Sequence, residues 1–140
     1  MAKYAKEKGA RIVSVHGETI AESVEPGTNR QAVESGHVDL LAHPGFLTLE
    51  EARIAAENDI YIEITRREGH CLTNGAVASV AKKANAKLLV NSDAHSHYDL
   101  YNPGRQKIIA MGSGLSETDA NDILEKNTAM FLSKLGYRLF

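Results

Sequence analysis

Three apolar runs of the sequence each end in side chains that commonly bind metal ions. One run ends in Asp93 and His95, separated by a single residue, and the other two end in His16 and His43. Neutral imidazole and carboxylate groups are the usual ligands of zinc and manganese. Gathered at one place, they would promote phosphate-ester hydrolysis, because a bound divalent ion acts as a Lewis acid and makes hydroxide from water. Any one of them alone is better interpreted as a hydrogen-bonded polar residue without a metal, so the hypothesis depends on their convergence.

The segments that lead to these residues have the composition of buried parallel strands. They are apolar, and turn-forming residues bound them. We expect strands over residues 11–16, 38–42 and 60–65, and a fourth strand that begins at Leu88. Because chemistry in α/β folds gathers at the carboxyl ends of strands, we expect the side chains that end these strands to share one rim.

Helical segments separate the strands. Thr48 and Glu51 form a capping-box pattern, which predicts a helix over residues 49–58. The apolar run at 108–111 is expected to be a partial strand. The other expected helices cover residues 29–35 after Thr28, about 74–85, 117–125 after Ser116 and 129–135 after Thr128, and residues 1–9 have the composition of a helix end.

Alternation of strands and helices with short links predicts parallel strands joined by right-handed crossovers. An open doubly wound sheet and part of a barrel both satisfy this order. The polar residues near strand ends favour the barrel, because an open sheet would concentrate them at one switch point. The residues expected to face inward are Ser14 and His16, Leu41 and His43, Glu63 and Thr65, and Asn91 and Asp93.

Composition excludes several classes of protein. The chain has 140 residues with 43% apolar content and a formal net charge of −2, which predicts no nucleic-acid partner. Cys71 is the only cysteine, so no internal disulfide can form, and a cytoplasmic location is expected. No apolar run approaches the roughly 20 residues of a membrane helix, so no membrane partner is expected.

Four motifs together resemble the PHP (polymerase and histidinol phosphatase) superfamily of phosphoesterases. They are V-H-G-E at residues 15–18, A-H-P-G at 42–45, I-E-I at 62–64 and N-S-D-A-H at 91–95. The similarity is greatest to small histidinol-phosphatase-like proteins and covers nearly the whole chain. It implies a partial (β/α)7 distorted TIM barrel, with parallel strands and outer helices, that binds divalent zinc, manganese or iron.

The resemblance also assigns roles to residues. His16 and His43 match two ligands of one metal, Asp93 matches a ligand of another, and His95 matches a ligand of a third. Asp93 and His95 are therefore the expected catalytic residues. The family's first strand carries an H-x-H pair, whereas the only H-x-H here is His95 and His97, after the last strand. We therefore expect residues 1–140 to form one PHP-like domain that lacks the N-terminal strands.

Other polar residues near the strand ends are candidates for supporting a metal ligand or for binding a substrate phosphate. Glu63 lies inside an apolar strand, where a carboxylate needs a partner, and we expect it to support a metal ligand rather than bind the metal directly. Glu18 is either a rim carboxylate that supports a ligand or a solvated loop charge. The candidates for gripping a substrate phosphate are Arg66, Arg67 and Arg105.

The remaining histidines and the cysteine are expected to lie outside the site. His70 and His97 are in rim loops, where each either faces the site or is exposed to solvent, and the exposed state is the more common one. His37 follows a helix stop at the opposite edge and receives no role. Cys71 is expected to be a small buried residue rather than a nucleophile.

Two functions follow from these features. The first is a metal-dependent phosphoesterase that hydrolyses a small phosphorylated substrate with a metal-activated hydroxide. The second is a non-catalytic PHP-like module, with or without a metal, that works by assembly with another chain. Because an incomplete barrel exposes strand edges, we also expect a homo-oligomer.

Overall fold

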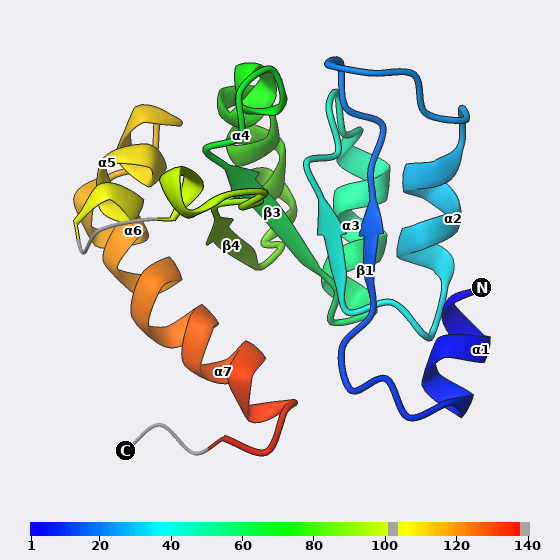
Figure 1. Cartoon of the computed structure of the whole chain (residues 1–140). Helices are drawn as coiled ribbons and strands as arrows, with labels where there is room; N and C mark the ends of the chain where they lie inside the picture. The colour runs from blue at the N-terminus through cyan, green and yellow to red at the C-terminus, as the bar shows by residue number, and fades with distance from the viewer. Residues whose placement is uncertain (101–103, 138–140) are drawn as a thin grey trace.

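A four-stranded parallel sheet organises the chain (Figure 1). The structure is a computed structural model and describes residues 1–100 and 104–137. The sheet order follows the sequence, and every neighbouring pair is parallel, as expected. Helices surround the sheet, so the α/β fold class with the character of a partial barrel is confirmed. The strands are β1 (Ser14–His16), β2 (Leu40–Ala42), β3 (Tyr61–Thr65) and β4 (Leu88–Asn91).

The first two strands are shorter than expected because a side chain replaces part of the ladder. The backbone N–H of Val13 donates to the Asp39 carboxylate at 2.7 Å, while the Val13 carbonyl accepts from Asp39 N and Leu40 N. Asp39 therefore ties the two strands together before regular pairing begins.

One face of the sheet packs against helices and forms the main core. Leu41, Ile62 and Ile64 on this face are fully buried. The opposite face carries Leu40 and Tyr61 in a second, smaller cluster with Leu89. The prediction that Leu41 faces inward is therefore wrong, because Leu40 occupies that face and strand residues alternate.

The helices α2 (Thr28–Glu34), α3 (Leu49–Glu57) and α4 (Asn74–Ala84) pack on the main core, and Ala110 and Ala120 of the C-terminal helices join it. The capping box at the start of α3 is confirmed, since Thr48 and Glu51 satisfy each other's backbone N–H groups. Thr28 is not a cap, because it is already helical. The backbone N–H of Asn29 instead donates to the carboxylate of Glu18 at 2.8 Å.

The C-terminal helices lie beside β4 (Figure 1). They are α5 (Arg105–Gly112), α6 (Glu117–Asp122) and α7 (Thr128–Ser133), and a π-helical stretch at Ile123–Asn127 joins the last two. The expected partial strand at 108–111 is therefore wrong, since a four-residue apolar run does not separate strand from helix. Thr128 does not cap a new helix either, because the backbone is already helical there.

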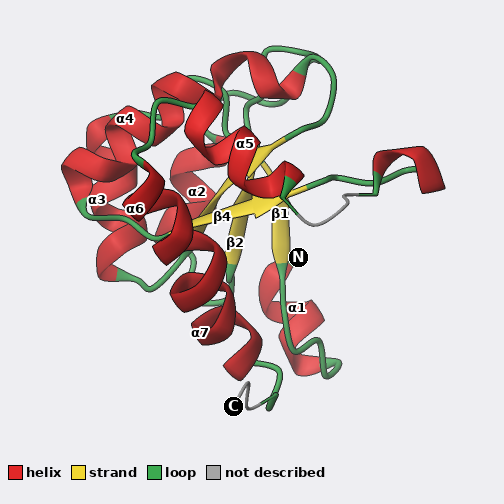
Figure 2. Ribbon diagram, turned by 90° about the vertical axis from the view of Figure 1, so that its left-hand side faces the viewer, coloured by secondary structure: helices red, strands yellow, loops and turns green. Residues whose placement is uncertain are grey.

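The amino ends of the strands are held by ion pairs. Figure 2 places α1 (Ala2–Glu7) and α7 on this side of the sheet. Lys6 lies 2.6 Å from the Asp39 carboxylate, and Lys134 lies 3.2 Å from Asp59. These contacts tie both terminal helices to the sheet, away from the histidine-bearing ends of the strands. Among the described helices, none combines the length and the apolar character needed to cross a bilayer.

Candidate metal centre

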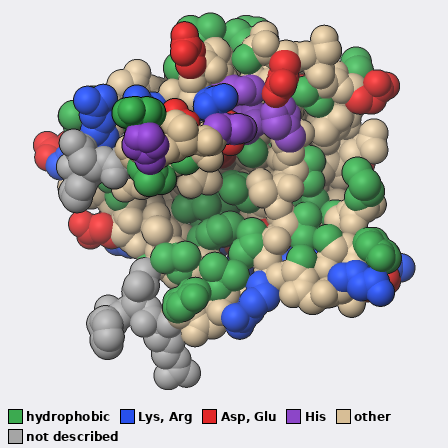
Figure 3. All heavy atoms as spheres, in the orientation of Figure 1, with side chains coloured by type: hydrophobic (Ala, Val, Ile, Leu, Met, Phe, Trp, Pro, Cys, Tyr) green, Lys and Arg blue, Asp and Glu red, His purple; other side chains and the backbone are tan. Residues whose placement is uncertain are grey.

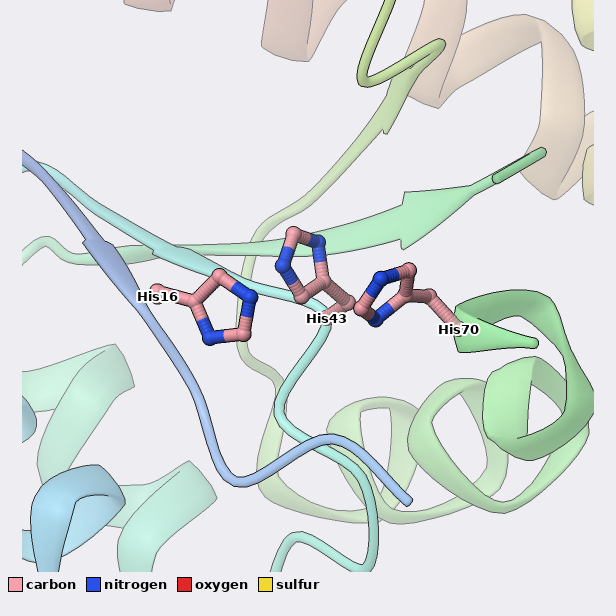
Figure 4. Close-up of side chains that lie close together, drawn as sticks. All are labelled: His16, His43 and His70. Carbon is pink, nitrogen blue, oxygen red and sulfur yellow. The ribbon is translucent and has the colours of Figure 1, made fainter. Parts of the chain in front are cut away.

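Three histidines converge at the carboxyl ends of β1, β2 and β3 (Figure 4). His16 ends β1, His43 directly follows β2, and His70 begins a short 3-10 turn (His70–Thr73) after β3. One nitrogen from each ring lies within 4.8 Å of the others. The ring centroids are 4.3 Å apart for His16 and His43, and 4.4 Å apart for His43 and His70. This cluster is called the histidine triad below.

His43 is fixed at the centre of the triad by Glu63. Both side chains are buried, with 4% and 2% of their surface exposed. One Glu63 oxygen accepts from the His43 backbone N–H at 2.9 Å and lies 2.7 Å from its Nδ1. Because a carboxylate only accepts, Nδ1 carries the hydrogen, and the buried Nε2 is left with no hydrogen-bond partner. Such a carboxylate–imidazole pair is typical of a metal ligand and its support.

His16 lies at the exposed side of the triad. Its Nδ1 is 3.0 Å from the Gly17 carbonyl, and its Nε2 is 2.8 Å from a carboxylate oxygen of Glu22. Glu22 also reaches to 3.9 Å from Nε2 of His70. The loop after β1 therefore brings a carboxylate to two of the three rings, at a position for which the sequence analysis named no residue.

His70 faces the site, which is the less expected of the two states considered for this rim-loop histidine. Its side chain is only 11% exposed, and its Nδ1 is 2.6 Å from the hydroxyl of Thr19. Burial, and next the neighbouring His43, lower the pKa of His70 below its usual value, which favours the neutral imidazole that metals bind. The position of His70 in the sequence was the available signal, because each of the first three strands has a histidine at its carboxyl end or in the loop that follows.

The loops that carry His16 and His43 pack backbone against backbone. A Cβ on Gly17 would lie 2.6 Å from the Ala42 carbonyl, and one on Gly45 would lie 1.9 Å from the Glu18 carbonyl. Only glycine permits these approaches. The buried side chain of Asn29 bridges the two loops, accepting from Glu18 N at 2.9 Å and donating to the Pro44 carbonyl at 2.8 Å. The spacing between the two histidines is therefore set by rigid contacts.

The other two expected metal ligands, Asp93 and His95, are not members of the histidine triad. His95 is exposed, and its Nδ1 lies 2.9 Å from the backbone carbonyl of Asp93. Asp99 accepts from the backbone N–H groups of His95 and Ser96, which folds this segment back on itself. Those contacts also lower the pKa of Asp99, with the bond from His95 N as the largest cause. Burial and His43 lower the pKa of His70 by more than the Asp93 carboxylate raises it.

Two of the three expected phosphate-binding arginines line one pocket beside the triad. The pocket has a volume of about 400 Å³ and is lined by Arg66, Arg67, Glu68, Ser92 and Asp99. Arg66 donates to the Tyr98 carbonyl at 3.2 Å, and Arg67 lies 3.6 Å from the Asp99 carboxylate. Arg105 is exposed at the start of α5 and does not contribute to this lining.

The other residues considered from sequence lie outside the triad. Glu18 accepts from the Asn29 backbone N–H, where a negative charge complements the start of a helix. His97 is exposed with its ring 3.8 Å from that of Tyr98, measured between centroids. Cys71 is only partly buried, and His37 is exposed.

The triad has the donor set of a site for a divalent ion. It offers three imidazole nitrogens with a carboxylate beside them, and imidazole suits zinc and other first-row transition metals. On the face shown in Figure 3, histidine side chains gather near the top, above a region of hydrophobic side chains. The site therefore opens toward solvent on one side while His43 anchors it to the core.

Comparison with known proteins gives relatives of several kinds. No family model matches the chain. An uncharacterized protein of Methanocaldococcus jannaschii is 48% identical over 124 residues, covering 89% of this chain and 57% of that protein. Ribonuclease P protein component 3 of Methanosarcina mazei is 34% identical, covering 81% of this chain and 51% of that protein. A probable phosphatase of Shewanella halifaxensis is 35% identical over 82 residues, covering 49% of this chain and 32% of that protein.

A solved structure matches the whole fold. A chain in the cryo-EM structure of archaeal ribonuclease P with mature tRNA has a TM-score of 0.71 and 19% identity, covering all of this chain and 68% of that one. At this identity the match concerns the fold alone. The present chain spans about half the length of the first curated relatives it matches. Together these similarities support a PHP-like fold.

The comparisons contradict the partners expected from sequence. The prediction named a small phosphorylated substrate and self-association, and it excluded nucleic acid. Relatives named for ribonuclease P, and a structural neighbour solved with tRNA, show that this prediction is wrong. Its physical weakness was the use of net charge, which averages over the surface and does not detect a local pair such as Arg66 and Arg67 at the rim.

Proposed function

We propose that this chain is a metal-binding, PHP-like module that works in assembly with protein subunits and RNA rather than alone. The similarity to ribonuclease P protein component 3 over four-fifths of the chain carries this proposal. The fold match to a chain of archaeal ribonuclease P supports it. The proposal includes a cytoplasmic location, because a sequence with one cysteine forms no internal disulfide and so fits a reducing compartment.

The rim of the sheet near the histidine triad carries side chains of the kinds that bind RNA. Arg66 and Arg67 line the same pocket, and a guanidinium matches the geometry of a phosphate. The Tyr98 side chain is 79% exposed, and its ring contacts that of His97. The backbone carbonyl of the same Tyr98 accepts from Arg66. Single-stranded RNA is commonly held by basic side chains together with exposed aromatic rings that stack on bases.

Within this proposal, His16 and His43 hold a divalent ion, zinc or manganese. The orphaned Nε2 of His43 fits this role, because a buried imidazole nitrogen without a hydrogen-bond partner is an available ligand. When bound, the ion would supply positive charge at the rim. Glu63 holds the His43 ring in the orientation and tautomer that keep Nε2 free.

Replacing Arg66 and Arg67 by alanine is expected to weaken binding of fluorescently labelled tRNA at least about 10-fold at low salt, equivalent to about 1.4 kcal/mol. The change removes two guanidinium groups from the rim pocket. The slope of log affinity against log salt should fall by about one for each phosphate that the variant no longer binds. Fluorescence anisotropy over a salt series measures both quantities.

A matched control removes two positive charges far from the rim. Arg53 on α3 and Lys83 on α4 are both exposed, and the Arg53→Ala/Lys83→Ala variant has the same net charge as the test variant. Equal loss of tRNA affinity in both variants would mean that only the total charge matters. That result would refute the proposal that RNA binds at the rim. Absence of tRNA binding by the unaltered chain at low salt would refute the RNA partner itself.

A second candidate function is a metal-dependent phosphoesterase of the histidinol-phosphatase-like kind. The histidine triad and the local similarity to a probable phosphatase favour it. A chromogenic aryl phosphate with added manganese should then be turned over, and His43→Ala should abolish the turnover. Arg53→Ala serves as the control that keeps the triad intact. A chain that binds the metal without any turnover would contradict this candidate and leave the assembly module standing.

A further inference from the structure

The loop between β1 and α2 carries a carboxylate to the histidine triad. One oxygen of Glu22 lies 2.8 Å from Nε2 of His16 and 3.9 Å from Nε2 of His70. We infer that Glu22 and His70 complete a four-ligand zinc site with His16 and His43. This inference rests on the metal binding in the proposed function and adds the two ligands that neither the sequence motifs nor the relatives assign.

Only one of the two ring nitrogens of His43 has a hydrogen-bond partner among the described residues. Its Nδ1 is taken by Glu63 at 2.7 Å, so Nε2 is the only atom that His43 offers to the triad. That atom is buried and has no hydrogen-bond partner. A buried polar atom without a partner is rare in folded proteins and needs an explanation. A zinc ion in the triad would provide the missing partner.

The two ring nitrogens of His16 both face oxygen atoms. Its Nδ1 faces the Gly17 carbonyl at 3.0 Å, which accepts hydrogen bonds but cannot donate. Nδ1 therefore carries the hydrogen, and Nε2 faces the Glu22 carboxylate at 2.8 Å. This contact needs a positive charge, which either a second proton on the His16 ring or a metal cation bound by both atoms supplies. A zinc ion in the triad would take the place of that proton.

Two contacts determine where Glu22 lies, and both involve the loop that carries His70. The Thr19 hydroxyl is 2.6 Å from Nδ1 of His70 and accepts from the Ala21 backbone N–H at 3.2 Å. A Cβ on Gly69 would lie 2.9 Å from the Cβ of Ala21, so the two loops are in close contact. Thr19 can accept the Nδ1 hydrogen of His70, which leaves the His70 Nε2 free to bind metal.

Three imidazoles and one carboxylate form a ligand set suited to zinc. Structural zinc sites are four-coordinate and closed, whereas catalytic sites keep one position open for water or substrate. Glu22 would occupy that fourth position. Its side chain is 56% exposed, so it closes the triad from the solvent side. A closed site agrees with a module that works by assembly.

The test is zinc binding by the full chain, with zinc chloride as the only ligand, followed by competition with a chromogenic chelator. Glu22→Gln is expected to lower the zinc affinity about 10- to 100-fold, the range known for disturbing the shell around a metal. His70→Ala is expected to lower it at least as much. Glu25→Gln, which removes a charge from an exposed position in the same loop, should bind zinc as the unaltered chain does.

A second readout separates ligation from a general effect of charge. The visible spectrum of the cobalt-substituted chain reports the ligand set directly, and it should change with Glu22→Gln but not with Glu25→Gln. Unchanged zinc affinity and an unchanged cobalt spectrum in Glu22→Gln would overturn the inference while leaving zinc binding intact. Failure of the unaltered chain to bind zinc would overturn both this inference and the metal part of the proposed function. The tRNA measurements test the remainder independently.

Discussion

Replacing Glu63 by alanine is expected to lower the free energy of unfolding by about 2–6 kcal/mol. One carboxylate oxygen accepts from both the backbone N–H and the ring Nδ1 of His43, in a buried environment. Removal of Glu63 would leave two buried donors without partners, each costing about 1–3 kcal/mol. Urea denaturation followed by circular dichroism measures the change.

The Glu63→Gln variant keeps the side-chain volume and one acceptor oxygen, so it measures the loss of the charge alone. An amide oxygen keeps two lone pairs and can still accept from His43, so we expect a loss below about 2 kcal/mol. Zinc affinity should fall about 10- to 100-fold in Glu63→Ala, because the imidazole loses the group that orients it. If Glu63→Ala is as stable as the unaltered chain, the buried pair does not exist in solution.

Replacing Tyr61 by alanine should also destabilise the fold by about 3–5 kcal/mol, the usual cost of removing a buried aromatic side chain. Tyr61 is 1% exposed, and its ring centroid lies 4.9 Å from that of Phe131 on α7 at an interplanar angle of 71°. The amino groups of Lys87 and Lys134 lie 5.4 Å and 5.3 Å from the ring centroid. The substitution would therefore loosen α7 from the sheet, as thermal and urea denaturation would measure.

Tyr61→Phe is the matched control, since it keeps the ring contacts and removes only the hydroxyl. Burial raises the pKa of Tyr61, so the hydroxyl is neutral near pH 7 and its removal should cost less than about 1.5 kcal/mol. Equal losses in the two variants would mean that the hydroxyl, and not the ring packing against Phe131, holds the helix.

Strand ends were predictable from sequence because composition and turn residues mark them. All four strands lie within the predicted apolar runs, and His16 and His43, at the carboxyl ends of β1 and β2, do meet at one rim. The orientation of Leu41 was not predictable by counting from His43. The backbone φ of His43 is +30°, which breaks the alternation of the strand and redirects this side chain to the rim.

Contacts between loops cannot be predicted from the periodicity of the sequence. Glu22 and His70 are far apart in the sequence, and the contact of Ala21 with Gly69 brings them together. No repeat of two or 3.6 residues describes such a contact. The local fold after β4 was likewise not predictable from periodicity, because Asp99 folds the segment back by accepting from the backbone N–H groups of His95 and Ser96.

The rim holds two residues other than glycine with left-handed backbones, His43 at φ +30° and Asp93 at φ +48°. Each such conformation costs about 1 kcal/mol in a residue with a Cβ. Glycine at position 93 would relax the backbone, yet it would also delete the carboxylate that influences His70. Substitutions chosen only to raise thermal stability are therefore expected to favour glycine at this rim position, at the expense of a side chain that acts on the histidine triad.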